Sequence, residues 1–274
     1  RSRRLADVTR EIAELVEQGT SEVTLLGQTV NSYHDGEHDF ADLLRAAGAV
    51  NGLRRLRFTS PYPTDFTPRV IDAMATVPAV CEHVHLPVQS GSNTVLRRML
   101  RRYTRERYLE VVSELRRVMP QITFSTDIIV GFPGETESDF EQTLSLVSAA
   151  DFDDAYTFKY SVREGTPAIR LRDHVPDEVA SARLDRLVEV VRAKGRQKNM
   201  ARLGSVHEAL VERRAKRGHL MLARTRGNHL VLLDLPVTAI GSYHQVRLTG
   251  STGSTFTGSV VSPSSVASPA LAVL

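Results

Sequence analysis

The sequence contains a single cysteine, Cys81, among 274 residues. One thiol cannot close a disulfide within the chain, which excludes the disulfide-stabilised secreted folds and is typical of a reducing compartment. We expect Cys81 to be a small buried side chain beside a strand.

Tryptophan and long apolar runs are also absent. Aromatic residues make up 6% of the sequence and apolar residues 41%, which is typical of a soluble globular protein. No apolar stretch approaches the roughly 20 residues that a membrane-spanning helix needs. The amino-terminal residues R-S-R-R-L-A-D-V lack the apolar segment of a signal peptide. We therefore expect a cytoplasmic protein with no membrane partner.

Most of the chain lacks an excess of charge of either sign. Residues 1–203 carry 28 Lys and Arg against 29 Asp and Glu, whereas residues 204–261 carry seven against three. A basic excess confined to one segment indicates a polyanion partner, nucleic acid first. A solvated basic turn is the alternative that charge alone leaves open. The cluster that carries most of the excess is Arg213, Arg214, Lys216 and Arg217.

Apolar positions follow strand and helix periods in alternation through the first two thirds of the chain. A strand followed by a helix, repeated several times, indicates an α/β fold with a parallel sheet. Five strands are too few to close an eight-stranded barrel, so we predict an open, partial (βα) barrel. The strands are expected at 22–27, 53–59, 83–88, 123–131 and 155–161, and the helices at 4–18, 40–49, 68–76, 93–99, 104–118, 137–149 and 176–202.

Beyond Gly204 the pattern changes to short strands with turns. This spacing predicts a small antiparallel β-barrel of the oligonucleotide-binding type. The domains are therefore predicted as residues 1–203, which include a linker helix at their carboxyl end, and residues 204–261, with a disordered tail at 262–274. The strands of the barrel are expected at 206–212, 219–226, 230–233, 243–248 and 254–261.

The turn G-F-P-G-E-T, from Gly131 to Thr136, joins an apolar strand to a helix. Two glycines let the backbone approach a ligand, and Pro133 stiffens the turn. Thr136 is predicted to cap the helix with Asp139, which leaves N–H groups that favour an anion. An ordinary strand-to-helix loop explains the same residues.

Six motifs follow one another along the chain, and together they resemble the radical S-adenosylmethionine (SAM) methylthiotransferases over residues 1–261. The G-Q-x-V-N-S-Y block resembles the branch that modifies tRNA, and the carboxyl-terminal barrel resembles the RNA-binding TRAM domain of this family. The motifs are L-L-G-Q-T-V-N-S-Y (25–33), R-F-T-S-P-Y-P-T-D-F (57–66), H-L-P-V-Q-S-G-S-N (85–93), R-M-L-R-R-Y-T-R-E-R-Y (98–108), S-T-D-I-I-V-G-F-P-G-E-T (125–136) and F-K-Y-S-V-R-E-G-T-P-A (158–168).

The resemblance implies an enzyme that cleaves SAM at an iron–sulfur cluster and methylthiolates N(6)-isopentenyladenosine beside the anticodon of tRNA. It implies two [4Fe-4S] clusters in an intact member, a tRNA anticodon stem-loop as partner, and a monomer. The sulfur source and the electron donor stay open. Two alternatives remain: a methylthiotransferase that acts on an aspartate of a ribosomal protein, and a non-catalytic RNA-binding remnant.

One departure from the family is severe. Members bind the SAM-cleaving cluster through C-x-x-x-C-x-x-C, because three thiolates hold three irons and leave the fourth open. Cys81 alone cannot do this, and it lies in none of the six motifs. The segment R-S-R-x-L corresponds to the residues just after the family's cluster loop, so the chain resembles a piece that begins downstream of it. We expect no metal site and no activity of the chain by itself.

The resemblance also implies site residues, although the catalytic residues stay unknown. Strand-ending turns and helix caps are the competing explanations for the SAM residues, and loop chemistry or core packing for the substrate residues. His83 and His85 share one strand face, and hydrogen bonding or stacking is favoured there over metal binding. The residues expected to bind SAM are Gly27, Gln28, Gln89, Ser90, Asp127, Gly131 and Gly134, and those expected to bind the substrate are Asn31, Tyr33, Lys159 and Tyr160.

A dense run of arginines follows the third strand. On a helix they cannot all face the core, so we expect most to be exposed and available for phosphates. A solvated helix face is the alternative. The run comprises Arg97, Arg98, Arg101, Arg102, Arg105 and Arg107.

We predict that the isolated chain assembles no iron–sulfur cluster, because its one thiol cannot supply three ligands. Anaerobic reconstitution followed by iron and sulfide analysis measures this. A stoichiometric [4Fe-4S] cluster whose spectrum changes on addition of SAM would contradict the prediction.

Overall fold

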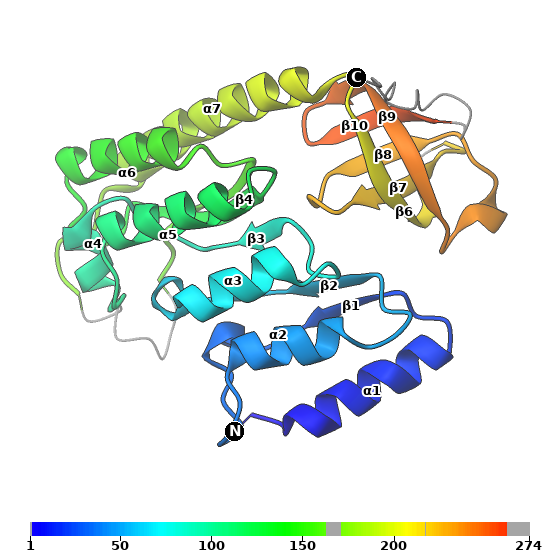
Figure 1. The fold of residues 1–274 in the computed structure, drawn as a ribbon. Coiled ribbons are helices and arrows are strands. Elements are labelled where there is room, and N and C mark those ends of the chain that lie inside the picture. Colours follow the sequence, from blue (N-terminus) through cyan, green and yellow to red (C-terminus); the bar gives the residue numbers. More distant parts are fainter. Residues whose placement is uncertain (1, 163–170, 217, 262–274) are drawn as a thin grey trace, which may run out of the picture. The chain divides into compact units, whose positions relative to one another are not determined.

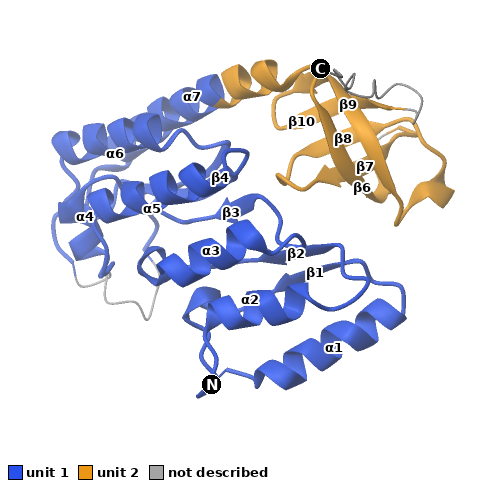
Figure 2. Cartoon of the chain, in the orientation of Figure 1, with its two compact units in different colours: residues 1–194 blue, residues 195–274 orange. Residues whose placement is uncertain are grey.

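The computed structural model describes residues 2–162, 171–216 and 218–261. The chain forms two compact units, residues 1–194 and residues 195–274 (Figure 2). The predicted disordered tail at 262–274 lies outside the described residues. In the part of the chain that is described, no helix is both long and apolar enough to cross a bilayer.

Helices and strands alternate through the first unit, as the periodicity predicts (Figure 1). The expected elements are all present, and their bounds differ from the prediction by three residues or fewer. They are α1 (Leu5–Glu17), β1 (Glu22–Leu25), η1 (Val30–Ser32), α2 (Phe40–Gly48), β2 (Arg55–Phe58), η2 (Pro63–Asp65), α3 (Pro68–Thr76), β3 (His83–His85), α4 (Asn93–Arg98), α5 (Arg105–Val118), β4 (Thr123–Val130), α6 (Glu137–Ala150), β5 (Asp154–Lys159) and α7 (Asp177–Arg202).

The strands pair in parallel, as predicted, but in two groups. β1 pairs with β2, and β3, β4 and β5 form a second sheet in that order. The residues just before β3 connect the groups: Leu56 N donates to Ala79 O at 2.7 Å, and Cys81 N donates to Leu56 O at 3.0 Å. Cys81 is 2% exposed, which confirms that it is a small buried residue beside a strand.

The two faces of β4 differ in character. Phe124 and Ile128 are fully buried in the core formed with the helices, whereas Asp127 between them is only half-buried. Tyr156 lies beside Asp127 on β5 and is 53% exposed. The helices therefore cover one face of the sheet, and the other face keeps polar and aromatic side chains accessible within the first unit.

The largest buried tyrosine of this core has a hydrogen-bond partner. The Tyr108 ring is fully buried, and its hydroxyl donates to Leu86 O at 2.7 Å. Burial raises the pKa of the Tyr108 hydroxyl. Its hydrogen bond fixes α5 to the chain that follows β3.

The second unit contains a closed barrel. Its strands follow the order β10-β8-β7-β6-β9 around a core that includes Val211, Val231 and Phe256. Neighbouring strands are antiparallel except β8 and β10, which are parallel. The prediction of a wholly antiparallel barrel is wrong at this pair, because five strands cannot alternate in direction around a closed ring. The elements are β6 (Val206–Arg214), β7 (Met221–Thr225), β8 (Leu230–Leu233), η4 (Val237–Ala239), β9 (Tyr243–Thr252) and β10 (Thr255–Val260).

A carboxylate that is distant in sequence accepts a hydrogen bond from a backbone N–H at the start of α1. The residue before the helix, Arg4, makes no side-chain cap, and Leu5 N donates instead to Asp35 Oδ2 at 2.8 Å. The other oxygen of Asp35 accepts from Glu37 N at 3.1 Å and from His38 N at 2.9 Å. The hydrogen bond from Leu5, followed by those from His38 and Glu37, holds the pKa of Asp35 well below its ordinary value of 3.8.

Because the folded-state pKa of Asp35 is depressed, its stabilising effect is present above the ordinary carboxyl range and is lost as pH falls through and below 4. Asp35→Asn should therefore lower Tm at neutral pH and flatten the dependence of Tm on pH between 5 and 3. Thermal melts at several pH values measure this, with Asp185→Asn on the exposed side of α7 as the matched control. An Asp35→Asn protein with an unchanged pH profile would contradict the assignment.

Candidate functional site

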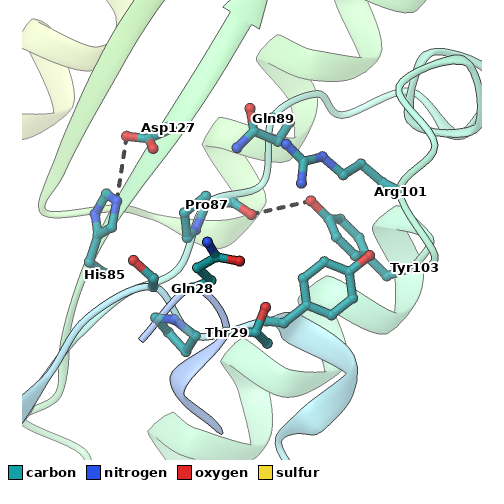
Figure 3. Close-up of a pocket in the computed structure, with 11 residues that line it drawn as sticks. Gln28, Thr29, His85, Pro87, Gln89, Arg101, Tyr103 and Asp127 are labelled. Atoms are coloured by element: carbon teal, nitrogen blue, oxygen red, sulfur yellow. Dashed lines mark hydrogen bonds and ion pairs between the residues drawn. The ribbon is translucent and has the colours of Figure 1, made fainter. Parts of the chain in front are cut away.

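A pocket of about 240 Å³ opens at the carboxyl ends of β1, β2 and β3 (Figure 3). This edge of a parallel sheet is where α/β proteins bind ligands, because the strand-to-helix loops converge there. The pocket is lined by Gln28, Thr29, Ser60, Pro61, Tyr62, His85, Pro87, Gln89, Arg101, Tyr103 and Asp127.

Gln89 is held by β4. Its N–H donates to Asp127 O at 2.8 Å, and its carbonyl accepts from Ile129 N at 2.9 Å. The residue adopts a φ of 66°, a conformation that non-glycine residues rarely take, and it is 8% exposed. This backbone conformation, fixed by β4, brings the Gln89 amide to the pocket (Figure 3).

Gln28 reaches the pocket from the end of β1. Gly27 does not line the pocket; a Cβ at this position would lie 3.1 Å from Val30 Cα. Gly27 therefore permits the tight turn from β1 into η1 that presents Gln28.

Asp127 and His85 lie on neighbouring strands, with their side chains at ion-pair distance (Figure 3). Asp127 Oδ1 lies 3.5 Å from His85 Nε2, and His85 Nδ1 lies 2.9 Å from Ser125 Oγ. The His85 ring also meets the Tyr156 ring edge-on, with centroids 5.8 Å apart. His83 Nδ1 lies 3.0 Å from Thr123 Oγ1. Hydrogen bonding is therefore confirmed at both histidines, and the ring contact of His85 is edge-on.

The Q-S-G-S turn is built against α6. Ser90 Oγ lies 3.4 Å from Thr143 Oγ1, outside the pocket lining, and Ser92 caps α4. A Cβ on Gly91 would lie 2.5 Å from Gln142 O, so glycine is required for this close approach. The hydroxyl of Ser90 is thus directed to the helix packing and not to the pocket.

The turn after β4 is closed by a carboxylate. Gly131 N and Phe132 N donate to Glu135 Oε2 at 2.6 and 3.2 Å, and Arg183 of α7 lies 3.5 Å from the other oxygen. Burial raises the pKa of Glu135, and the Arg183 guanidinium opposes this shift. The predicted helix cap by Thr136 is confirmed, because it forms a capping box.

Both glycines of this turn have positive φ, 73° at Gly131 and 81° at Gly134. A Cβ on Gly131 would lie 2.6 Å from Ala180 Cβ, and one on Gly134 would lie 2.3 Å from Arg98 Cζ. The space that these glycines leave is filled by α7 and by an arginine. Neither glycine lines the pocket.

Asn31 and Tyr33, expected on the substrate side, use their polar groups within the protein. Asn31 brackets the backbone of Tyr62, donating to its carbonyl at 2.9 Å and accepting from its N–H at 2.7 Å. Tyr33 donates to Arg3 O at 2.8 Å. Neither Asn31 nor Tyr33 lines the pocket.

On β5 and after it, Lys159 and Tyr160 contact neighbouring segments and also lie outside the pocket lining. Lys159 Nζ lies 2.6 Å from the Asp177 carboxylate and 3.2 Å from Ser181 Oγ. The Tyr160 ring packs edge-on against Phe132 at 5.0 Å.

The prediction that most of the arginine run is exposed is wrong. Only Arg97 and Arg102 are exposed, because the others are drawn into contacts with neighbouring loops and helices. Arg101 lines the pocket together with Tyr62 and Tyr103, none of which the sequence assigned to the site. The other contacts are Arg98 with Asp173, Arg105 with the carbonyls of Gly91 and Gln142, and Arg107 with Glu110 and the carbonyl of Phe66.

In the second unit the basic cluster lies at the end of β6. Arg213, Arg214 and Lys216 are exposed, and Arg217 lies outside the described residues. Exposed cations next to a hairpin are accessible to a polyanion.

We predict that Gly131→Ala destabilises the protein by about 1–3 kcal/mol more than Gly19→Ala, because a methyl group at 131 overpacks against Ala180. Gly19 is the matched control: its φ of 95° is also positive, and nothing lies within 4 Å of its Cβ direction. Urea unfolding measures both variants. Equal losses of stability would show that the α7 contact carries no steric constraint.

Comparison with curated proteins shows close relatives. The tRNA-2-methylthio-N(6)-dimethylallyladenosine synthase of Carboxydothermus hydrogenoformans is 47% identical over 253 residues, which cover 91% of this chain and 58% of that protein. The protein of the same name from Moorella thermoacetica is 48% identical over 253 residues, covering 91% of this chain and 57% of that one. The chain thus spans somewhat more than half the length of these relatives.

Among solved structures, coproporphyrinogen III oxidase from Escherichia coli, a radical SAM enzyme, superposes with a TM-score of 0.55. It is 14% identical, with 90% of this chain and 61% of that chain covered, so the likeness concerns the fold alone. Residues 1–147 match the radical SAM superfamily. This span is more than half of the 274 residues and contains the strands and loops that form the pocket. The chain therefore belongs to the radical SAM superfamily.

Proposed function

We propose that this chain acts in the methylthiolation of N(6)-isopentenyladenosine beside the anticodon of tRNA. The observation that carries the proposal is the 47% identity, over 91% of the chain, with a tRNA-2-methylthio-N(6)-dimethylallyladenosine synthase. The pocket at the carboxyl edge of the sheet supports it, because the chemistry of its lining matches a small polar ligand.

SAM fits the pocket as a ligand that carries positive charge and several hydrogen-bonding groups. Asp127 offers a carboxylate to a cationic centre, and Gln28 and Gln89 offer amide donors and acceptors. Gly27, Ser90, Gly131 and Gly134 shape the surrounding backbone, so in this proposal they act on SAM through the loops that they support. When bound, SAM supplies the adenosyl group for hydrogen abstraction and the methyl group for transfer.

Part of the pocket wall is made of proline and tyrosine side chains. Two prolines and two tyrosine rings line it: Pro61, Pro87, Tyr62 and Tyr103. The rings of Tyr62 and Tyr103 meet edge-on at 5.3 Å, and Tyr103 donates to Pro87 O at 3.2 Å. These contacts hold the pocket open before a ligand enters, which lowers the ordering cost of binding.

An iron–sulfur cluster does not fit the residues present. Cys81 is the only cysteine of the sequence and is 2% exposed. Within the described ranges, no group of three or more His, Cys, Asp or Glu side chains could hold a metal ion. We therefore propose that the chain by itself is inactive, because its described residues cannot hold a cluster.

The substrate side of the proposal involves Asn31, Tyr33, Lys159 and Tyr160. We propose that they position loops around the nucleoside, and the contacts that they make within the protein support this role. Asn31 does so most directly, since it fixes the backbone of Tyr62 at the pocket wall.

The second unit is proposed as the RNA anchor. Its closed five-stranded barrel and its basic excess of seven Lys and Arg against three Asp and Glu over residues 204–261 suit a TRAM-type contact with the anticodon stem-loop. A single buried cysteine is compatible with a cytoplasmic location, and we propose a monomer.

We predict that the chain binds an anticodon stem-loop more tightly when the stem-loop carries N(6)-isopentenyladenosine than when it carries adenosine. The reason is that the apolar isopentenyl group gains contacts with accessible aromatic side chains of the first unit, such as Tyr156. Fluorescence anisotropy with the two RNAs measures the ratio. Equal affinities would instead favour a non-catalytic RNA-binding protein.

A second prediction concerns the salt dependence of that binding. Replacing Arg213, Arg214 and Lys216 with Ala should weaken the binding of both RNAs equally. It should also reduce the slope of log K against log salt concentration by about 0.7 for each phosphate that is no longer neutralised. A control of matched charge replaces the exposed Arg97, Arg102 and Arg117. If the control flattens the slope and the first set does not, the RNA anchor lies in the first unit.

A further inference from the structure

The Ser125 hydroxyl lies between two histidine rings on the polar face of the second sheet. Ser125 Oγ is 2.9 Å from His85 Nδ1 and 3.4 Å from His83 Nε2. A hydroxyl has one hydrogen to donate, so Ser125 can donate to one ring only and must accept an N–H from the other. Ser125 is 5% exposed, which leaves water little access to replace either contact. The hydrogen positions on the two rings are therefore coupled through one serine.

A threonine fixes the hydrogen on the far side of His83. Thr123 Oγ1 donates to Glu82 O at 3.1 Å, because a carbonyl oxygen can only accept. Toward His83 Nδ1, at 3.0 Å, the same hydroxyl therefore accepts, and His83 carries a hydrogen on Nδ1. In a neutral His83 the other nitrogen, Nε2, is then an acceptor on the side of Ser125.

At the pocket end, His85 faces a carboxylate. His85 Nε2 lies 3.5 Å from Asp127 Oδ1, and both residues line the pocket. The carboxylate attracts an N–H at this position and repels a nitrogen lone pair. A neutral His85 therefore prefers its hydrogen on Nε2, which leaves Nδ1 as an acceptor on the side of Ser125.

When both rings are neutral, these two preferences compete for the single hydrogen of Ser125. His83 Nε2 and His85 Nδ1 are then both acceptors, and Ser125 can donate to one of them. One added proton resolves the competition: the ring that takes it donates to Ser125 Oγ, and Ser125 donates to the other ring. The added proton can rest on either ring, because Ser125 passes it on by accepting one hydrogen and releasing the other.

Carboxylates on the neighbouring strands favour the added proton. Asp127 on β4 faces His85 directly, and the charge of Asp154 on β5 also acts on His85. Tyr156 on β5 meets the His85 ring edge-on. The charged side chain across the pocket is Arg101, which Figure 3 shows on the side away from Asp127. A cation that binds Asp127 weakens the attraction that holds the proton.

We infer that His83, Ser125 and His85 form a proton relay that ends at the pocket and gives up one proton when a cation binds Asp127. The relay rests on the contacts within the sheet, whereas the exchange rests on the proposed function, in which the cation is SAM. A ligand in the pocket covers the near side of His85. The proton then leaves through Ser125 to His83, which is half-buried, and from there to solvent.

The relay is tested in the ligand-free chain by nitrogen-15 NMR of the imidazole rings between about pH 5 and 8, where histidine changes charge. The shifts report which ring nitrogens carry a hydrogen. A shared proton makes His83 and His85 respond in the same pH step. Ser125→Ala removes the bridging hydroxyl, and we expect the two rings to titrate independently in that variant.

The matched control is Ser242→Ala. It removes a serine–histidine contact of 2.8 Å, to His244 in the second unit, and should leave the titration of His83 and His85 unchanged. Circular dichroism melts establish that both variants are folded. The titration of the unmodified chain decides the matter even if Ser125→Ala fails to fold, because independent steps there would overturn the relay.

The exchange is tested by calorimetry with SAM in two buffers of different ionisation enthalpy, which gives the number of protons released. At the midpoint of the shared pH step we expect about 0.5 proton for each SAM bound, because half of the chains then hold the added proton. The comparison ligand is 5′-methylthioadenosine, which lacks the cationic groups of SAM and should release none.

The outcomes separate this inference from the proposed function. If the two rings share a pH step but SAM does not bind, the relay stands and the SAM proposal fails. If SAM binds with no more proton release than 5′-methylthioadenosine, the exchange is overturned and the SAM site stands.

Discussion

The pocket depends on the two hydrogen bonds that join the Gln89 peptide to β4. They hold Gln89 at a φ of 66° and draw the chain after β3 along the edge of β4 for four residues beyond the strand. Val88 N adds a bond of 2.9 Å to Thr126 Oγ1. Without this pairing the loop before α4 would be free to leave the sheet, and Gln89 and Asp127 would not share a pocket. The side chain of a residue with strained backbone is therefore placed by strand pairing and not by its own preference.

The same loop also sets the positions of the helices. Ser92 caps α4 and donates to Asp139 at 2.5 Å, and Gly91 allows α6 to approach. α6 begins directly after the turn that Glu135 closes, and Arg183 ties that turn to α7. Nearby residues of this loop therefore have different roles: Gln89 faces the pocket, whereas Gly91 and Ser92 contact the helices. This division explains why a contiguous motif contributes only some of its side chains to the pocket.

The elements were largely predictable from the sequence, because apolar periodicity reports burial directly. The α3 helix, Pro68–Thr76, has the bounds that the periodicity predicts, and the structure shows Thr67 as its cap. The parallel pairing of β8 with β10 was not predicted, because ring closure is a property of the whole barrel. Gln28, Gln89 and Asp127 were assigned to the site and do line the pocket.

Other residues that the sequence assigned to the site do not line the pocket, for a physical reason. Asn31 and Ser90 carry polar groups in ligand-like motifs, but distant partners, the Tyr62 backbone and Thr143, take up those groups. Arg101 shows the reverse case: it lies in a run of arginines, and only the three-dimensional contacts separate it from its neighbours. Which polar groups remain unsatisfied is decided by long-range packing, and a local pattern does not contain that information.

The central claim is that SAM occupies the pocket at the carboxyl edge of the sheet in the first unit. A crystal structure of the chain grown with SAM tests it most directly. We expect ligand density against Gln28, Gln89 and Asp127, with the Gln89 backbone unchanged. Density for SAM elsewhere on the chain, with these three side chains facing solvent, would contradict it.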